Sequence, residues 1–263
     1  MKGTALILAG GGGKGAYEIG VWKAMREQGK DRQITAVSGT SVGGLNGALF
    51  AQGDYEAAER IWLAISEEKI LTPGRKNLLE GLSDLARNGI ISEAADMLKE
   101  GAFTREGLIA IIRRELDVNR INDRQIPCYA ACYNVTARLV DYINITGMRQ
   151  NDMETILLAT SALPGIFEPV KFGNSLYLDG GLGDNVPVRP LYNAGYRDFL
   201  IIHLGSRSLV DETDYPGAAI AQLIPSEDQG DFVTGTLDFS EEGARRRIRQ
   251  GYEDGKKFFS ISH

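Results

Sequence analysis

The chain has 263 residues, of which 43% are apolar, and it carries a formal net charge of −6. This apolar content is ample for a sizeable core and excludes a disordered chain. The acidic charge argues against a nucleic-acid partner, because clustered Lys and Arg supply most of the affinity for nucleic acids.

The N-terminal part alternates strand and helix patterns, which is typical of a parallel sheet. Residues 4–9 form an apolar run that is too short to span a bilayer and leads directly into glycines. We therefore expect a first strand here and no signal peptide. Apolar residues at i, i+4 spacing predict a helix over 17–28, which Gly29 ends. Residues 34–38 predict a second strand, and a glycine-rich helix is expected from Val42.

The middle of the chain, residues 66–123, shows only helical patterns, at 77–88, 92–100 and 104–116. We expect this part to form a helical insertion or cap over the sheet. Strand patterns resume at 126–135, 138–146, 176–181 and 198–206, with a helix over 152–163 between them. Together these elements predict a single domain over residues 1–263 with a central, mostly parallel sheet.

The last part of the chain, about residues 207–263, is expected to be an extension that contains a strand near 221–226 and a basic helix near 241–259. The basic residues of this helix have two interpretations, contact with lipid phosphates or a solvated helix face, and we favour the solvated face. They are Arg245, Arg246, Arg247 and Arg249.

The two cysteines, Cys128 and Cys132, lie four residues apart in a predicted strand. Such a separation holds them about 13 Å apart, beyond the reach of a disulfide. We expect both to be reduced core residues and the protein to be cytoplasmic.

The glycine run at residues 10–15 follows a predicted strand, precedes a predicted helix and satisfies G-x-G-x-x-G. A dinucleotide site also requires an acidic residue at the end of the next strand, where this chain has Ser38 and Gly39. The run is not a phosphate-binding Walker loop either, because a glycine follows Lys14. A nucleotide-binding module remains an alternative on these grounds.

Ser41 lies between Gly39 and Gly43 in the pattern G-x-S-x-G, where strand two meets a helix. A nucleophilic serine on such a turn needs small neighbours. The first two strands are expected side by side, so the glycine run would reach the same sheet edge and offer backbone N–H groups to an oxyanion. Alone the pattern is weak, because it also fits an ordinary N-cap serine.

The order of candidate residues along the chain does not by itself decide which residue would activate Ser41. The series Ser41, Asp179, His203 matches the chain order of α/β-hydrolases, but their nucleophile follows several strands and here it follows the second. His203 lies inside an apolar run and His263 is the last residue. The sequence therefore favours a mechanism without histidine, and the triad stays an alternative.

Four segments, "GGGGKGAY", "GTSVGG", "ATSALPGIFEPV" and "LDGGLGDNVPV", occur in this order. With them the chain resembles the patatin-like phospholipases over about residues 3–206. The resemblance implies an α/β fold, a three-layer α/β/α sandwich with a helical insertion. It also implies a lipid acyl hydrolase that cleaves phospholipid or lysophospholipid esters without metal or cofactor, with transient contact to a membrane surface. A carboxylesterase for short soluble esters is the alternative enzyme.

The resemblance also implies site residues. Ser41 is the expected nucleophile and Asp179 its base, in a dyad without histidine. The expected oxyanion hole consists of Gly11, Gly12 and Gly13, and the supporting motif residues are Gly10, Lys14, Gly15, Gly39, Gly43, Gly180 and Gly181. An aspartate with its reference pKa of about 3.9 is a poor base, so we expect partial desolvation to raise that pKa. Headgroup, acyl position, acyl length and oligomeric state are left open.

Overall fold

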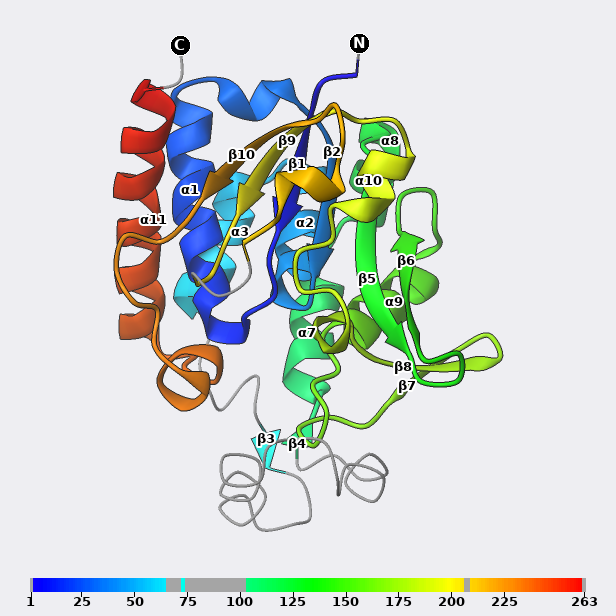
Figure 1. The fold of residues 1–263 in the computed structure, drawn as a ribbon. Helices are drawn as coiled ribbons and strands as arrows, with labels where there is room; N and C mark the ends of the chain where they lie inside the picture. Colours follow the sequence, from blue (N-terminus) through cyan, green and yellow to red (C-terminus); the bar gives the residue numbers. More distant parts are fainter. Residues whose placement is uncertain (1, 65–71, 74–102, 206–208, 262–263) are drawn as a thin grey trace.

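A computed structural model describes residues 2–64, 72–73, 103–205 and 209–261. Its main sheet is mixed and lies among helices, as the sequence predicted (Figure 1). The strands of this sheet are β1 (Thr4–Leu8), β2 (Ile34–Thr40), β5 (Cys128–Asn134), β6 (Leu139–Asn144), β7 (Val170–Phe172), β8 (Ser175–Asp179), β9 (Asp198–Ile202) and β10 (Ala219–Leu223).

The order across the sheet is β10-β9-β1-β2-β5-β8-β7, and β6 also pairs with β5. The first five strands of this order are parallel, whereas the pairings of β5 with β6, β5 with β8 and β7 with β8 are antiparallel. In β1 and β9 all residues except the first are buried, as expected for parallel strands covered on both faces. Leu8 of β1 pairs with Gly39 of β2, so the ends of these strands lie side by side as predicted.

The helices are α1 (Ala16–Glu27), α2 (Val42–Gln52), α3 (Tyr55–Ala64), α7 (Glu106–Glu115), α8 (Val118–Arg124), α9 (Gln150–Thr160), α10 (Arg189–Asn193) and α11 (Glu241–Ile261). α2 packs on β2 and β5, and α9 packs on β5, β7 and β8. Both α1 and α2 begin within one residue of their predicted starts. Gly29, with a φ of 67°, follows the end of α1 in the left-handed conformation that a glycine favours.

The middle of the chain departs from prediction in one respect. Two short strands, β3 (Thr72–Pro73) and β4 (Phe103–Thr104), pair in antiparallel fashion where only helices were expected. The helix predicted over 104–116 is confirmed as α7, while those at 77–88 and 92–100 lie outside the described residues. Two-residue strands carry no periodicity, so a sequence pattern could not reveal them.

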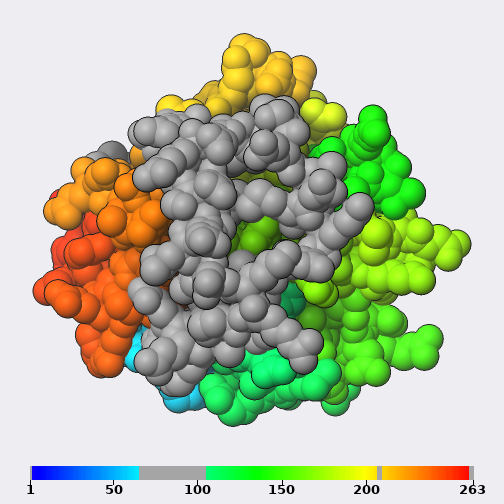
Figure 2. Space-filling view, turned by 90° about the horizontal axis from the view of Figure 1, so that it is seen from below, coloured from blue at the N-terminus to red at the C-terminus, as the bar shows by residue number. Residues whose placement is uncertain are grey.

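The C-terminal extension is part of the same layered structure. β10 adds to the edge of the main sheet beside β9, and α11 packs lengthwise on α1, where the Tyr17 hydroxyl donates to Asp254 at 3.0 Å (Figure 1). Seen from below, orange and red residues of this extension lie on one side of the molecule, and green residues, which come after residue 103 in the chain, lie on the other (Figure 2). The interpretation of the basic residues as solvated is wrong for Arg247, which is only 1% exposed.

Candidate active site

Ser41 occupies a sharp turn between a strand and a helix. β2 ends at Thr40 and α2 begins at Val42, and Ser41 between them has a φ of 55° and a ψ of −124°. A non-glycine residue rarely adopts positive φ, and such strain is common at functional sites. The flanking glycines are required by close approach, because a Cβ at Gly39 would lie 2.2 Å from the Gly43 carbonyl oxygen.

Asp179 ends β8 and is 2% exposed. Its Oδ1 accepts the N–H of Gly181 at 2.8 Å, and its Oδ2 has no hydrogen-bond partner among the described residues. Burial raises the pKa of Asp179 to about 6, although the Ser41 hydroxyl and the Gly181 N–H both act to lower that pKa. Asp179 is therefore ionised at neutral pH and a better proton acceptor than an ordinary aspartate. Gly180 lies directly on β5, since a Cβ there would be 2.2 Å from the Ala131 carbonyl oxygen.

The glycine loop, defined as residues 10–15, follows β1 at the same sheet edge. Gly12–Gly15 form one turn of 3-10 helix, and Gly12 has a φ of 55°. The first N–H groups of a helix have no acceptor within it, and those of Gly12 and Gly13 have none elsewhere in the described part of the chain. Gly11 lies against Leu204, and Gly12 lines a pocket together with Ser41. The loop can thus offer free donors to an oxyanion near Ser41.

Asp184 and Asn185, which the sequence analysis did not single out, join the segments of the site. Gly10 donates its N–H to the Asn185 carbonyl at 3.1 Å, and Asn185 Nδ2 donates to the Gly10 carbonyl at 3.1 Å. Thr40 Oγ1 donates to the Asp184 carbonyl at 2.8 Å. The segment that carries Asp179 is therefore fixed to both the glycine loop and the serine turn. The only signal in the sequence was their place in "LDGGLGDNVPV".

Thr160, the last residue of α9, holds the backbone of Ser41. Its hydroxyl donates to the Ala131 carbonyl at 2.6 Å and accepts the Ser41 N–H at 3.0 Å. The backbone N–H of Ser41 is therefore already engaged. This N–H is not free to bind an oxyanion in this structure.

The two remaining residues of the glycine loop have structural contacts. Lys14 lies beside Gly235. The pKa of Asp231 is lowered mainly by hydrogen bonds from Thr234 and Val233, and to a smaller extent by the charge of Lys14. The Gly15 carbonyl accepts Asn46 Nδ2 at 3.0 Å.

Asn46 is the centre of a buried polar network between α1, α2 and α3. Its Nδ2 also donates to Glu18 at 2.7 Å, and its Oδ1 accepts Trp62 Nε1 at 3.0 Å. Burial raises the pKa of Glu18 well above its usual value, against the opposing hydrogen bond from Asn46. The network ties the glycine loop to Trp62 in the pocket wall.

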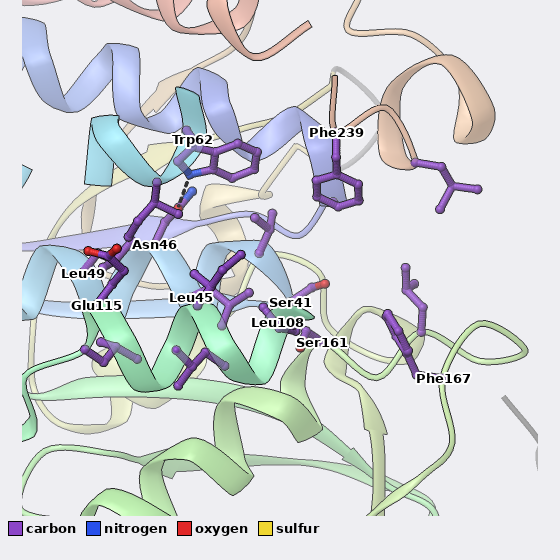
Figure 3. A pocket seen from close by; sticks show the side chains of 18 residues that line it. Ser41, Leu45, Asn46, Leu49, Trp62, Leu108, Glu115, Ser161, Phe167 and Phe239 are labelled. Atoms are coloured by element: carbon purple, nitrogen blue, oxygen red, sulfur yellow. Dashed lines mark hydrogen bonds between the residues drawn. The ribbon is translucent and has the colours of Figure 1, made fainter. Parts of the chain in front are cut away.

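The pocket that contains Ser41 is almost entirely apolar and has a volume of about 90 Å³. Ser41, Leu108 and Ser161 lie together between Leu49 and Glu115 on one side and Phe167 on the other, with Trp62 and Phe239 above them (Figure 3). Leu49 is eight residues beyond Ser41, which is about 12 Å along a helix. The full lining comprises Gly12, Ser41, Val42, Leu45, Asn46, Leu49, Ile61, Trp62, Leu108, Ile111, Ile112, Glu115, Leu116, Ser161, Leu163, Phe167, Leu237 and Phe239.

His203 lies away from this pocket. It is 1% exposed, its Nε2 is 2.9 Å from Gln222 Oε1, and burial lowers its pKa. His263 is outside the described residues.

Cys128 and Cys132 are free and buried, as predicted, and burial raises the pKa of Cys128 to about 12. Within the described ranges no three His, Cys, Asp or Glu side chains gather as a metal site would require.

Comparison with known proteins gives consistent results. The model of the family "Patatin-like phospholipase" matches residues 6–192. Human patatin-like phospholipase domain-containing protein 6 is 30% identical over 210 residues, and lysophospholipase NTE1 of Cryptococcus neoformans is 26% identical over 218 residues. Each alignment covers 80% of this chain but only 14% and 12% of the respective relative, so the chain spans a small fraction of their length.

Solved structures agree on the fold. VipD from Legionella pneumophila has a TM-score of 0.54 at 14% identity, covering 99% of this chain and 67% of that one. Human GIVD cytosolic phospholipase A2, in complex with methyl gamma-linolenyl fluorophosphonate, has a TM-score of 0.50 at 12% identity, covering 98% and 58%. In the described ranges, every helix is too short or too polar to cross a bilayer.

Proposed function

This chain belongs to the patatin-like phospholipase family, and we propose that it is a serine acyl hydrolase that cleaves fatty-acyl esters of phospholipids or lysophospholipids. The observation that carries the proposal is the pocket: an apolar channel contains a serine on a strained turn, close to a buried aspartate and to free backbone donors. Such a channel fits hydrocarbon, and its reactive serine fits an ester.

In the proposed reaction, Ser41 Oγ attacks the ester carbonyl carbon while the Asp179 carboxylate, which interacts with the Ser41 hydroxyl, takes the hydroxyl proton. The N–H groups of Gly12 and Gly13, with Gly11 beside them, stabilise the oxyanion that forms. When the tetrahedral intermediate collapses, Asp179 returns the proton to the leaving alcohol oxygen and Ser41 stays acylated. Water then attacks the acyl-enzyme with Asp179 again as base, and the fatty acid leaves.

The length of the pocket defines the acyl group more closely. An extended polypeptide advances about 3.6 Å over three bonds, or roughly 1.2 Å per bond. The distance of about 12 Å from Ser41 to the level of Leu49 therefore corresponds to the length of about ten carbons, and the cavity of about 90 Å³ must widen around such a chain. At the far end, Glu115 is paired with Arg114 at 2.6 Å and Arg60 at 3.3 Å, and a longer chain would desolvate this ion pair. We therefore propose medium-chain acyl groups as preferred substrates.

The wider context is part of the same proposal. We treat residues 1–263 as one domain, because β10 extends the main sheet and α11 packs on α1. Two buried, unpaired cysteines favour a cytoplasmic protein. A substrate in a bilayer implies transient contact with the membrane surface. The name of the fungal relative makes lysophospholipids the first substrates to test.

The test combines covalent labelling with defined substrates. A fluorophosphonate probe should label the wild type and Ser260→Ala, an exposed serine on α11, but not Ser41→Ala. The wild type should hydrolyse lysophospholipids and phospholipid vesicles without added calcium. Equal labelling of Ser41→Ala would contradict the assignment of the nucleophile. Hydrolysis of acetyl esters alone would favour the carboxylesterase, and binding of NAD or ATP without ester hydrolysis would favour the nucleotide-binding module.

A further inference from the structure

A loop beyond the residues matched by the family model forms the support of the glycine loop. This C-terminal loop, defined as residues 229–239, approaches the glycines through its backbone. A Cβ at Gly12 would lie 2.1 Å from the Thr236 carbonyl oxygen, and one at Gly13 would lie 2.0 Å from the Asp238 carbonyl oxygen. Leu237 of the same loop lines the pocket with Ser41. The backbone of the C-terminal loop is therefore in direct contact with the backbone of the glycine loop at Gly12 and Gly13.

Arg247 on α11 holds the C-terminal loop from the inside of the protein. Its Nη1 donates to the Asp238 carbonyl at 3.1 Å, and its Nη2 donates to the carbonyls of Thr234 at 3.1 Å and Gln229 at 3.5 Å. The same guanidinium is 2.9 Å from the Asp238 carboxylate. One buried side chain thus fixes carbonyls at both ends of the loop.

The glycine loop depends on such support, because Gly10 to Gly13 have no side chains to anchor it. Its position is set by Asn185 on one side and by the C-terminal loop on the other. Backbone donors stabilise an oxyanion only when they point at it, and a displacement of about 1 Å can cost roughly a hundredfold in rate. A shift of the C-terminal loop would therefore reach the reaction.

We propose that Arg247 is a positioning residue that fixes the oxyanion donors of Gly12 and Gly13 through the C-terminal loop. The effect of Arg247 on catalysis rests on the proposed function, whereas its coupling to the glycine loop through the C-terminal loop does not. The unusual burial of Arg247 among exposed arginines is explained by this role. The bonds run to main-chain carbonyls, so the bidentate, planar guanidinium is needed and the charge alone is not enough.

The coupling is tested first without reference to activity. Hydrogen exchange is measured on peptides covering residues 10–17 and 229–239 in the wild type, Arg247→Met and Arg245→Met. Arg245 is the matched control, because it is exposed on the same helix and, among the residues that the structure describes, its ion pair is with Glu241. We expect exchange to accelerate about tenfold or more in both peptides of Arg247→Met and to stay unchanged in the control. Acceleration confined to residues 229–239 would overturn the proposal.

The second test is the effect on catalysis, measured on a medium-chain ester per folded molecule. Arg247→Met should lower kcat by about tenfold to a hundredfold with KM within about threefold, and Arg247→Lys should restore little. Added guanidinium ion should recover part of the kcat of Arg247→Ala. If Arg247→Met does not fold, Asp238→Asn removes the ion pair and should show the same changes at a few-fold level.

The outcomes separate the inference from the proposed function. A folded Arg247→Met enzyme with kcat within twofold of the wild type would overturn the inference and leave the function intact. A wild type that neither hydrolyses esters nor reacts at Ser41 would overturn the function. In that case hydrogen exchange still decides whether Arg247 fixes the glycine loop.

Discussion

Replacing Asp179 by asparagine should abolish turnover and at the same time stabilise the protein. The asparagine keeps the shape of the side chain but cannot accept the Ser41 proton. A carboxyl group whose pKa rises from 3.8 to about 6 on folding opposes the folded state when it is ionised. At about 1.36 kcal/mol per pKa unit, its removal should increase the free energy of unfolding by about 3 kcal/mol.

This stabilisation has a defined pH dependence. Below pH 3.8 Asp179 is protonated in both states of the wild type, so the variant has no advantage. As the pH rises from 3.8 to about 6, the unfolded chain releases its proton before the folded chain does, and the wild type loses stability relative to Asp179→Asn. Above about pH 6 the difference is constant. For the same reason, kcat/KM of the wild type should fall about tenfold per pH unit below pH 6.

The assay is urea unfolding of the wild type and Asp179→Asn between pH 3.5 and 8, with ester hydrolysis over the range in which the wild type stays folded. Asp123→Asn, a change at an exposed aspartate on α8, is the control and should alter the free energy of unfolding by less than about 0.5 kcal/mol. Equal stability of the wild type and Asp179→Asn at pH 8 would refute the reasoning about the buried carboxylate. Substantial turnover by a folded Asp179→Asn enzyme would refute its role as base.

Three further changes test the rest of the site. Gly12→Ala should lower kcat by about a hundredfold, because the new Cβ would push the loop away from Thr236; Gly173→Ala, at a φ of 58° with no neighbour within 4 Å, is the control for backbone strain and should keep its kcat. His203→Gln should retain most of the activity, and a folded variant as inactive as one without the nucleophile would restore the triad. Leu49→Trp should shorten the pocket, so kcat/KM for a ten-carbon ester should fall at least about tenfold relative to a four-carbon ester, which initial rates on a chain-length series would measure.

The sequence by itself determined the features that local chemistry controls. Apolar runs of strand length gave β1, β2 and β9, and glycines beside Ser41 predicted a turn that no larger residue could form. The parallel pairing of β1 with β2 placed the glycine loop beside Ser41, because consecutive strands of this kind are usually neighbours. These features need only the conformational limits of a few adjacent residues and the period of a short segment.

Only the tertiary structure decided what supports and tunes the site. Thr160 holds Ser41 from 119 positions away, and Asn185 bonds to Gly10 from 175 positions away, contacts that no periodicity records. Arg247 differs from the other arginines of α11 only in that it lies on the side of the helix that packs inward. The pKa of Asp179 is raised by burial under the assembled chain. Hydrogen bonds and desolvation of this kind depend on which distant residues the fold brings into contact, and a short segment of sequence contains no information about its partners.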